Sequence, residues 1–241
     1  MVHLADDVIK PSSFDEFVGQ KDLIESLRVY VGAAKMRGEI LGHTLICGKE
    51  GLGKKTIAHI IANEMGEHMT IVDAHEISDE SDLIGLLCNL NSHNIFVIEN
   101  IHLLKPRLIK LLITAMKYFY VEVTIGRDAT MRSIRIDLLH FTLIGLTDQP
   151  NKLPYLLKDQ FEISLKIEPY KADQLKEIIS YRCKVYNIEM DEEAKDVVIN
   201  QSDVTPLSII RLMRRIRDFS QFYKEASFDE ERTLQILKFL S

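Results

Sequence analysis

A glycine-rich turn between a strand and a helix constrains the fold of this chain more than any other stretch. Gly48, Gly53 and Lys54 have the spacing of the G-x-x-x-x-G-K part of the P-loop pattern. Residues 43–47 (HTLIC) are typical of a buried strand, and residues 56–65 (TIAHIIANEM) have helical periodicity. Between such a strand and helix, backbone N–H groups and the helix dipole bind anions. The sequence therefore predicts a phosphate-binding loop in an α/β fold, with the candidate residues Gly48, Gly51, Leu52, Gly53, Lys54, Lys55 and Thr56.

One position of this loop departs from the pattern, which has Ser or Thr after the lysine. That hydroxyl ligates the Mg²⁺ ion that bridges the nucleotide phosphates, and this chain has Lys55 there. Thr56 does not replace the hydroxyl directly, because one residue further along a helix turns the side chain by about 100°. The loop therefore predicts ATP or ADP as the ligand, with a doubtful Mg²⁺ site.

Composition limits the classes of function. The 241 residues include 30 basic and 36 acidic side chains, which give a formal net charge of −6. Proteins that coat nucleic acid are expected to be basic, so we expect any DNA contact to be local or made through a partner. No apolar run approaches the roughly 18 residues of a transmembrane helix, and the N-terminus is acidic where a signal peptide is basic. We expect a cytoplasmic protein without membrane contact, with three structural cysteines at no zinc-ligand spacing.

A second polar motif follows a predicted central strand at residues 95–98 (IFVI). In P-loop motors this strand usually ends in Asp, which helps to hold Mg²⁺, and a following Glu is the general base for water. Here the two residues are Glu99 and Asn100, and Glu99 with Thr56 are the candidate metal ligands. Asn100 cannot accept a proton, and a general base typically contributes about 10²–10⁴-fold. Hydrolysis is therefore predicted to be slow or absent.

The remaining pattern alternates strands and helices and becomes wholly helical from Pro169, which predicts two domains at residues 1–168 and 169–241. We expect helices at 21–35, 81–90 with Ser81 as N-cap, 108–118, 152–162, 174–186 and 228–240, strands at 69–73 and 141–147, and a β-hairpin at 121–137 that turns at 126–129.

Four stretches together resemble the RuvB family, the AAA+ motors of Holliday-junction branch migration. Residues 14–20 (FDEFVGQ) resemble the adenine-side segment of the family, and residues 51–64 resemble its P-loop and following helix. Residues 132–145 resemble a hairpin and sensor strand peculiar to the family, and residues 205–219 resemble its small helical domain. The resemblance implies an AAA+ P-loop domain with a parallel sheet, followed by a small all-α lid, in a protein of DNA recombination and repair.

The resemblance also implies roles for single residues. It places Phe17, Val18 and Tyr170 beside adenine and gives Thr147 as the hydroxyl of the first sensor strand. Lys158 lies in the region of the arginine finger, which is worth about 10³–10⁵ in rate where it has been characterised. Lysine has the charge without the planar fork of arginine. The implied catalytic set of Glu99, Asn100, Thr147 and Lys158 is thus mostly substituted, and Leu207 replaces a sensor arginine.

The family docks RuvA through the hairpin, so the resemblance implies a RuvA-like partner at residues 121–137 and homo- or hetero-oligomers of AAA+ subunits. Members of the family also have a winged-helix domain that contacts DNA, whereas this sequence ends after the last predicted helix. A truncated sequence and a naturally short protein look the same here.

Three functions remain open at this point. The first is a nucleotide-binding scaffold or assembly subunit with weak or no hydrolysis. The second is a working ATP-driven branch-migration motor with a compensated site, and the third is an interaction domain that binds no nucleotide. The helix at 174–186 is expected only to pack. The basic cluster at residues 211–217 is expected to be solvated or subunit-facing, with a direct DNA-binding helix as the alternative. Neither feature decides among the three functions.

Overall fold

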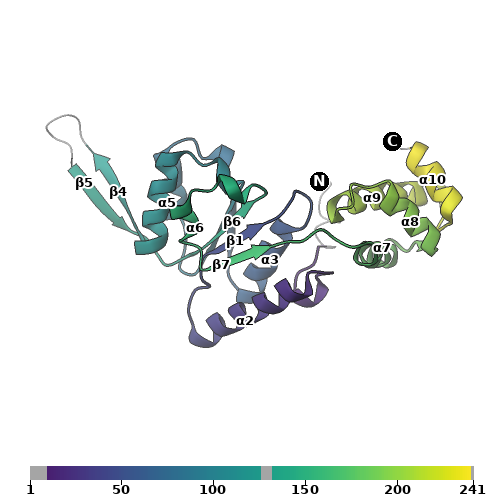
Figure 1. Ribbon diagram of the computed structural model, residues 1–241, viewed down its shortest axis with the longest axis horizontal. Helices are drawn as coiled ribbons and strands as arrows, with labels where there is room; N and C mark the ends of the chain where they lie inside the picture. Colours follow the sequence, from purple (N-terminus) through teal and green to yellow (C-terminus); the bar gives the residue numbers. More distant parts are fainter. Residues whose placement is uncertain (1–9, 126–131, 240–241) are drawn as a thin grey trace.

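The structure is a computed structural model that describes residues 10–125 and 132–239. Figure 1 shows an α/β body with a β-hairpin at one end and a group of helices at the other. The molecule is elongated, so the hairpin and the helical end lie far apart. The P-loop, between β1 and α3, lies between them.

The α/β body contains a five-stranded sheet in the order β2-β3-β6-β1-β7, and every pairing in it is parallel. All residues of β1 and β6 are buried, as expected for central strands covered on both faces. In the register, the last residue of β1 pairs with Thr147, and Asp73 pairs with Glu99. The polar strand ends therefore lie at one edge of the sheet, beside the P-loop. The strands are β1 (Thr44–Cys47), β2 (Met69–Asp73), β3 (Ile95–Glu99), β6 (Thr142–Thr147) and β7 (Ile163–Lys166).

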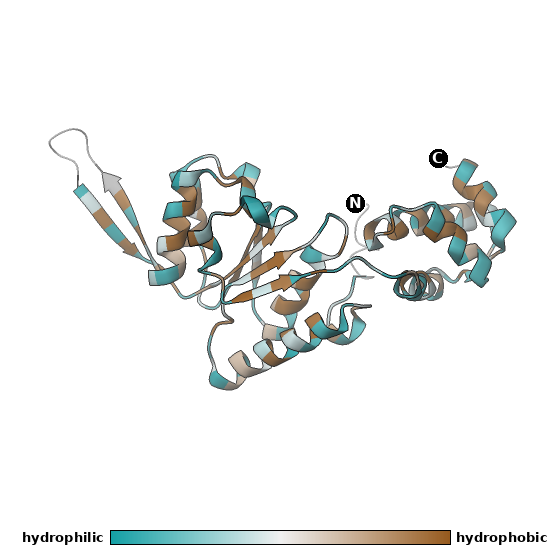
Figure 2. Cartoon of the chain, in the orientation of Figure 1, coloured by the Kyte–Doolittle hydropathy of each residue, from teal (hydrophilic) through white to brown (hydrophobic). Residues whose placement is uncertain are grey.

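Helices cover both faces of this sheet, and alternate strand residues point to opposite faces. Ile46 belongs to the hydrophobic cluster that includes α2 (Lys21–Arg37) and α3 (Lys54–Met65), and Leu45 belongs to the cluster with α4 (Glu80–Cys88) and α5 (Pro106–Tyr118). Figure 2 shows hydrophobic residues along the central strands and mixed colours on the helices that cover them. The short helices are η1 (Phe14–Glu16), η2 (Ala74–Glu76), η3 (Ile101–Leu103), η5 (Pro150–Lys152) and α6 (Tyr155–Lys158).

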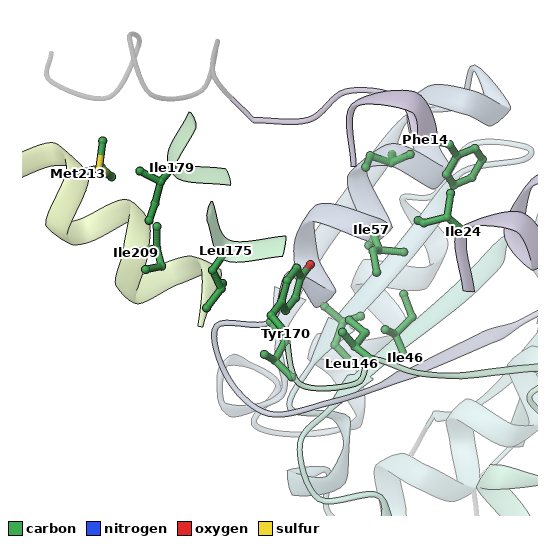
Figure 3. Packing of buried hydrophobic residues seen from close by; sticks show 14 of the residues in the cluster. Phe14, Ile24, Ile46, Ile57, Leu146, Tyr170, Leu175, Ile179, Ile209 and Met213 are labelled. Carbon is green, nitrogen blue, oxygen red and sulfur yellow. The ribbon is translucent and has the colours of Figure 1, made fainter. Parts of the chain in front are cut away.

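The helical end follows the last strand of the sheet. It consists of α7 (Ala172–Tyr186), α8 (Glu192–Asn200), α9 (Pro206–Tyr223) and α10 (Glu230–Phe239), with a two-residue parallel pairing of β8 (Glu189–Met190) and β9 (Ser227–Phe228). Tyr170 lies between the sheet residues and these helices, with Leu146 and Ile57 on one side and Leu175 on the other (Figure 3). One hydrophobic cluster thus runs from the sheet into the helices. Within the described residues, no helix is both long and apolar enough to cross a bilayer.

The predicted hairpin is confirmed in its two strands, β4 (Tyr120–Ile125) and β5 (Arg132–Asp137), which pair antiparallel from Tyr120 opposite Asp137. The predicted turn at 126–129 lies outside the described residues. Every residue of β5 is exposed, and the Arg135 guanidinium lies 4.1 Å from the centroid of the Tyr120 ring. β5 therefore presents both of its faces to solvent, whereas Val121 of β4 is buried in the core of the α/β body.

Three local predictions are wrong. The helix expected at 152–162 is broken into η5 and α6, and a fifth parallel strand, β7, follows directly. Asp79, rather than Ser81, caps α4, because its carboxylate accepts the backbone N–H of residues 81 and 82 in a capping box. The last helix begins at Glu230, since Phe228 pairs in β9.

Candidate functional site

The P-loop connects β1 to α3 in a backbone conformation that depends on glycine. Gly51 and Gly53 have φ of 80° and 100°, in the left-handed region that side chains rarely adopt. Gly48 donates its N–H to the Thr147 carbonyl at 3.0 Å, and a Cβ there would lie 3.2 Å from Ile167. Leu52 is buried in the core, so it anchors the loop from beneath. The sequence-predicted loop is confirmed as a strand, a tight turn and a helix start.

Lys54, the P-loop lysine, folds back on its own loop. Its Nζ atom donates to the Gly48 carbonyl at 2.6 Å and to the Lys49 carbonyl at 2.9 Å. Burial lowers the pKa of Lys54, although the nearby carboxylate of Asp148 favours the charged form. A desolvated ammonium is unfavourable without an anion, so a phosphate at the loop would compete with these two carbonyls for Lys54.

Lys55 and Glu99 form an ion pair at the position where the motif elsewhere holds a metal. The Lys55 Nζ atom lies 2.7 Å from the Glu99 Oε2 atom, and the two side chains are 53% and 26% exposed. The ammonium therefore contacts the carboxylate that Mg²⁺ would need, and the hydroxyl that the pattern supplies is absent. Among the described residues, no group of three or more His, Cys, Asp or Glu could hold a metal. These residues do not fit a magnesium ion.

Asn100 and Thr147 have partners of their own at the same edge of the sheet. Asn100 Nδ2 donates to the Asp73 carboxylate at 2.7 Å, and its backbone has a left-handed φ of 51°, which Asn adopts more readily than most residues. Thr147 Oγ1 lies 2.9 Å from His102 Nδ1 and accepts the backbone N–H of Gln149 at 3.0 Å. Burial lowers the pKa of His102, so its ring stays neutral near pH 7.

Lys158 ends the short helix α6 near the C-terminal end of β1. Its charge favours the thiolate of Cys47, although burial raises the pKa of that thiol overall. Two pockets lie beside the P-loop in the described part of the chain. Glu99 lines one of them, and Lys158 lines neither. The structure thus groups Glu99 with the loop, and Lys158 lies outside the pocket walls.

Two adjoining pockets lie beside the loop, and the first is mainly apolar. It is lined by Phe17, Val18, Gly53, Thr56 and Tyr170, together with residues of α7 and α9. Burial raises the pKa of Tyr170, which keeps its hydroxyl protonated. The second pocket is lined by the loop itself, including Lys54, Lys55 and Glu99. The structure brings together the predicted adenine-side residues and the predicted phosphate residues in neighbouring pockets.

The helical end packs directly on the loop. Leu207 donates its backbone N–H to the Gly51 carbonyl at 3.2 Å, and a Cβ on Gly51 would lie 3.0 Å from the Thr205 hydroxyl that caps α9. Leu207 thus contacts the loop through its backbone. Since both pockets include residues of α7 or α9, the pockets depend on this packing.

Two arginines at these pockets were missed by the sequence analysis. Arg182 of α7 is 4% exposed and lines both pockets, and Arg214 of α9 lines the loop pocket. Arg214 belongs to the basic cluster at 211–217, to which the sequence analysis gave no role at the nucleotide site. A signal for Arg182 was present, because Leu175, Ile179 and Arg182 share one helical face at spacings of four and three.

A parallel sheet with a P-loop after its central strand, and a helical lid packed on that loop, defines a protein of the AAA+ P-loop class. Family models agree with this class. The model described as "Holliday junction DNA helicase RuvB P-loop domain" matches residues 9–167, and "RuvB AAA lid domain" matches residues 170–241. The chain therefore belongs to the RuvB family.

Similar proteins agree with this assignment. The chain is 40% identical over 213 residues to the "Holliday junction branch migration complex subunit RuvB" of Myxococcus xanthus, which covers 88% of this chain and 62% of that protein. The protein of the same name from Campylobacter hominis is 37% identical over 93% of this chain and 66% of that protein. This chain thus spans less than two thirds of their length. A solved Thermotoga maritima RuvB Holliday junction branch migration motor matches with a TM-score of 0.85 at 31% identity, over 96% of this chain and 73% of that one.

Proposed function

We propose that this chain is a RuvB-type subunit of a Holliday-junction complex that binds ATP or ADP without Mg²⁺ and hydrolyses it slowly or not at all. Its role in the complex is that of a scaffold or assembly component. In this proposal residues 1–168 are the nucleotide domain and residues 169–241 are the lid. The proposal takes the class of complex from the names of the relatives and the altered chemistry from this chain's own residues.

The observation that carries the proposal is the ion pair of Lys55 with Glu99 at 2.7 Å. A P-loop motor uses Mg²⁺ to bridge the β- and γ-phosphates and to neutralise developing charge. Here a fixed ammonium supplies one positive charge beside the loop and pairs with the carboxylate that would otherwise face the metal. The Asn100 amide donates a hydrogen bond to the Asp73 carboxylate and cannot accept a proton from the attacking water. Binding can thus persist while hydrolysis is lost.

In this proposal the remaining candidate residues bind the base, bind the phosphates or position other groups. Phe17, Val18 and Tyr170 hold the base in the apolar pocket, which has the concave, largely apolar walls typical of small-molecule sites. Lys54 and the backbone N–H groups from Gly51 to Gly53 bind the phosphates, and Thr56 lines both pockets. Thr147 and Lys158 contribute no more than positioning.

For partners, we propose that the hairpin of β4 and β5 docks a RuvA-like protein and that AAA+ subunits assemble through other faces. Ile134 and Ile136 are 46% and 36% exposed on the hairpin, which gives an apolar contact surface. Ile134→Asp should abolish capture of RuvA in a pull-down, whereas Val29→Asp, on the distant exposed face of α2, should not. Equal capture by both variants would remove the docking role.

Isothermal titration tests the nucleotide proposal. ATP and ADP are titrated into the protein with Mg²⁺ or with EDTA, and phosphate release is then measured on the same sample with Lys54→Ala as the control. We expect equal affinities in both buffers and release no faster than that of the control. Mg²⁺-dependent binding with turnover would instead support a motor with a compensated site. No binding in either buffer would leave a nucleotide-free interaction domain.

A further inference from the structure

Arg182 is the most unusual side chain beside the P-loop, because it is an arginine buried on the apolar face of a helix. It follows Leu175 and Ile179 on α7, and only 4% of it is exposed. Its Nη1 atom is buried with no hydrogen-bond partner among the residues that the structure describes. Burial of a cation without full compensation is strongly unfavourable, so a buried arginine usually has an anion beside it.

Among the described residues, three acidic side chains line the two pockets that Arg182 lines; Glu50 is exposed to solvent, and the other two already have partners. Glu16 lines the same apolar pocket, but its carboxylate accepts hydrogen bonds from the Ser12 backbone N–H at 2.7 Å and the Ser12 hydroxyl at 3.0 Å. Glu99 lines the loop pocket and pairs with Lys55. The anion that would satisfy Arg182 is therefore expected to come from a ligand.

The position of Arg182 identifies the part of the ligand that it meets. It is one of six described residues that line both pockets, and Gly53 and Thr56 at the start of α3 are two of the others. If the base occupies the apolar pocket and the terminal phosphates occupy the loop, the group at the junction is the phosphate attached to the ribose. A guanidinium presents a planar fork of donors that suits two oxygens of one phosphate.

We propose that Arg182 binds the α-phosphate of the nucleotide from the lid, an assignment that rests on the proposed nucleotide function. Arg182 adds a charged side chain from α7 in a chain whose Leu207 donates to the loop only through its backbone N–H. Because Arg182 belongs to the lid and Lys54 to helix α3 of the α/β body, a bound nucleotide connects the two parts of the chain. The contact is common to ATP, ADP and AMP and absent from adenosine.

Arg182→Met tests the proposal, because binding and stability should respond in opposite directions. The variant removes a buried charge, so the ligand-free protein should melt at an equal or higher temperature than the wild type. Affinity for ATP, ADP and AMP should fall by the same factor of about 10 to 100, the value of a hydrogen bond to a charged group. Adenosine affinity should not change. Arg211→Met, on the exposed side of α9, is the matched control and should leave all four affinities unchanged.

Three other outcomes would each overturn a different part of the proposal. If the wild type binds ATP and Arg182→Met binds it equally well, the role of Arg182 is overturned while the nucleotide function stands. If ATP is weakened far more than ADP and AMP, Arg182 contacts the γ-phosphate and the α-phosphate assignment is wrong. If the wild type binds no nucleotide, the proposed function itself fails. Should Arg182→Met not fold, Arg182→Gln and Arg182→Lys replace it, with the larger loss of affinity expected for Gln.

Discussion

Replacing Lys55 with threonine should make nucleotide binding depend on Mg²⁺. In the wild type, Lys55 neutralises Glu99 at 2.7 Å, so the phosphates approach a pair of zero net charge. Lys55→Thr restores the hydroxyl of the P-loop pattern and leaves Glu99 as an unpaired carboxylate. In EDTA the phosphates then meet the Glu99 carboxylate without its lysine partner, and a bound metal ion would neutralise it.

The size of this effect follows from the exposure of the pair. Two unit charges 4 Å apart interact by about 1 kcal/mol in bulk water and by about 4 kcal/mol at an effective dielectric constant of 20. Lys55 is 53% exposed and Glu99 is 26% exposed, which favours the lower part of this range. A loss of about 1–2 kcal/mol corresponds to ATP binding that is roughly 5- to 30-fold weaker in EDTA. Stability should change little, because exposed ion pairs contribute about 0–1 kcal/mol.

Isothermal titration of ATP in EDTA and in Mg²⁺ measures this difference directly. We expect the Lys55→Thr variant to recover wild-type affinity only in Mg²⁺. Lys55→Met, which removes the charge without supplying a hydroxyl, should recover less. Lys195→Met removes a lysine that pairs with Glu192 at 2.6 Å on α8, away from the loop, and should bind as the wild type does. Wild-type affinity for Lys55→Thr in both buffers would refute the reasoning.

Three further predictions concern catalysis, packing and pH. Asn100→Glu together with Lys55→Thr should raise single-turnover phosphate release by about 100-fold or more, whereas Asn100→Glu alone should not, because the ammonium still contacts Glu99. Gly51→Ala should lower the free energy of unfolding in urea by at least about 2 kcal/mol, since a left-handed residue costs about 1–2 kcal/mol and its Cβ would lie 3.0 Å from the capping hydroxyl of α9. Gly38→Ala, with positive φ and open space around it, should show only the conformational cost. Burial lowers the pKa of His43 below 6.5, so the unfolded state binds the extra proton first as pH falls. The melting temperature should therefore fall below pH 6.5 more steeply for the wild type than for His43→Gln.

The elements that sequence predicts well are those with a strong local cause. The P-loop turn requires glycine at left-handed positions, and it lies between a short buried strand and a helix with clear apolar periodicity. The antiparallel pairing of β4 and β5 follows from alternation that each strand carries by itself. In each case a few adjacent residues contain the whole signal, and tertiary packing reinforces it.

The elements that sequence analysis misses are decided by distant partners. β7 is four residues long with alternating burial, and it exists because it pairs with β1 at the sheet edge, from Ile163 opposite Thr44. The spacing of α7 places Arg182 on an apolar helical face, but its position at the nucleotide pocket follows only from the packing of the lid, because the other residues of that pocket are distant in sequence. Lys55 was visible as a departure, but its contact with Glu99 depends on the parallel sheet that brings β1 and β3 to one edge.

The polar groups at the phosphate loop already have hydrogen-bond or ion-pair partners within the protein, which lowers the free energy that a nucleotide can gain there. Lys54 is hydrogen-bonded to two loop carbonyls, Lys55 is paired with Glu99, and Asn100 is bonded to Asp73. A nucleotide must displace at least the contacts of Lys54, so part of its binding free energy is spent on breaking bonds that already exist. Arg182 differs from this set, because its Nη1 atom is buried without a partner among the described residues. The largest gain on binding should therefore arise at the lid rather than at the loop. A nucleotide held mainly in this way would stabilise the packing of lid on sheet, and that is the property expected of a structural ligand in an assembly subunit.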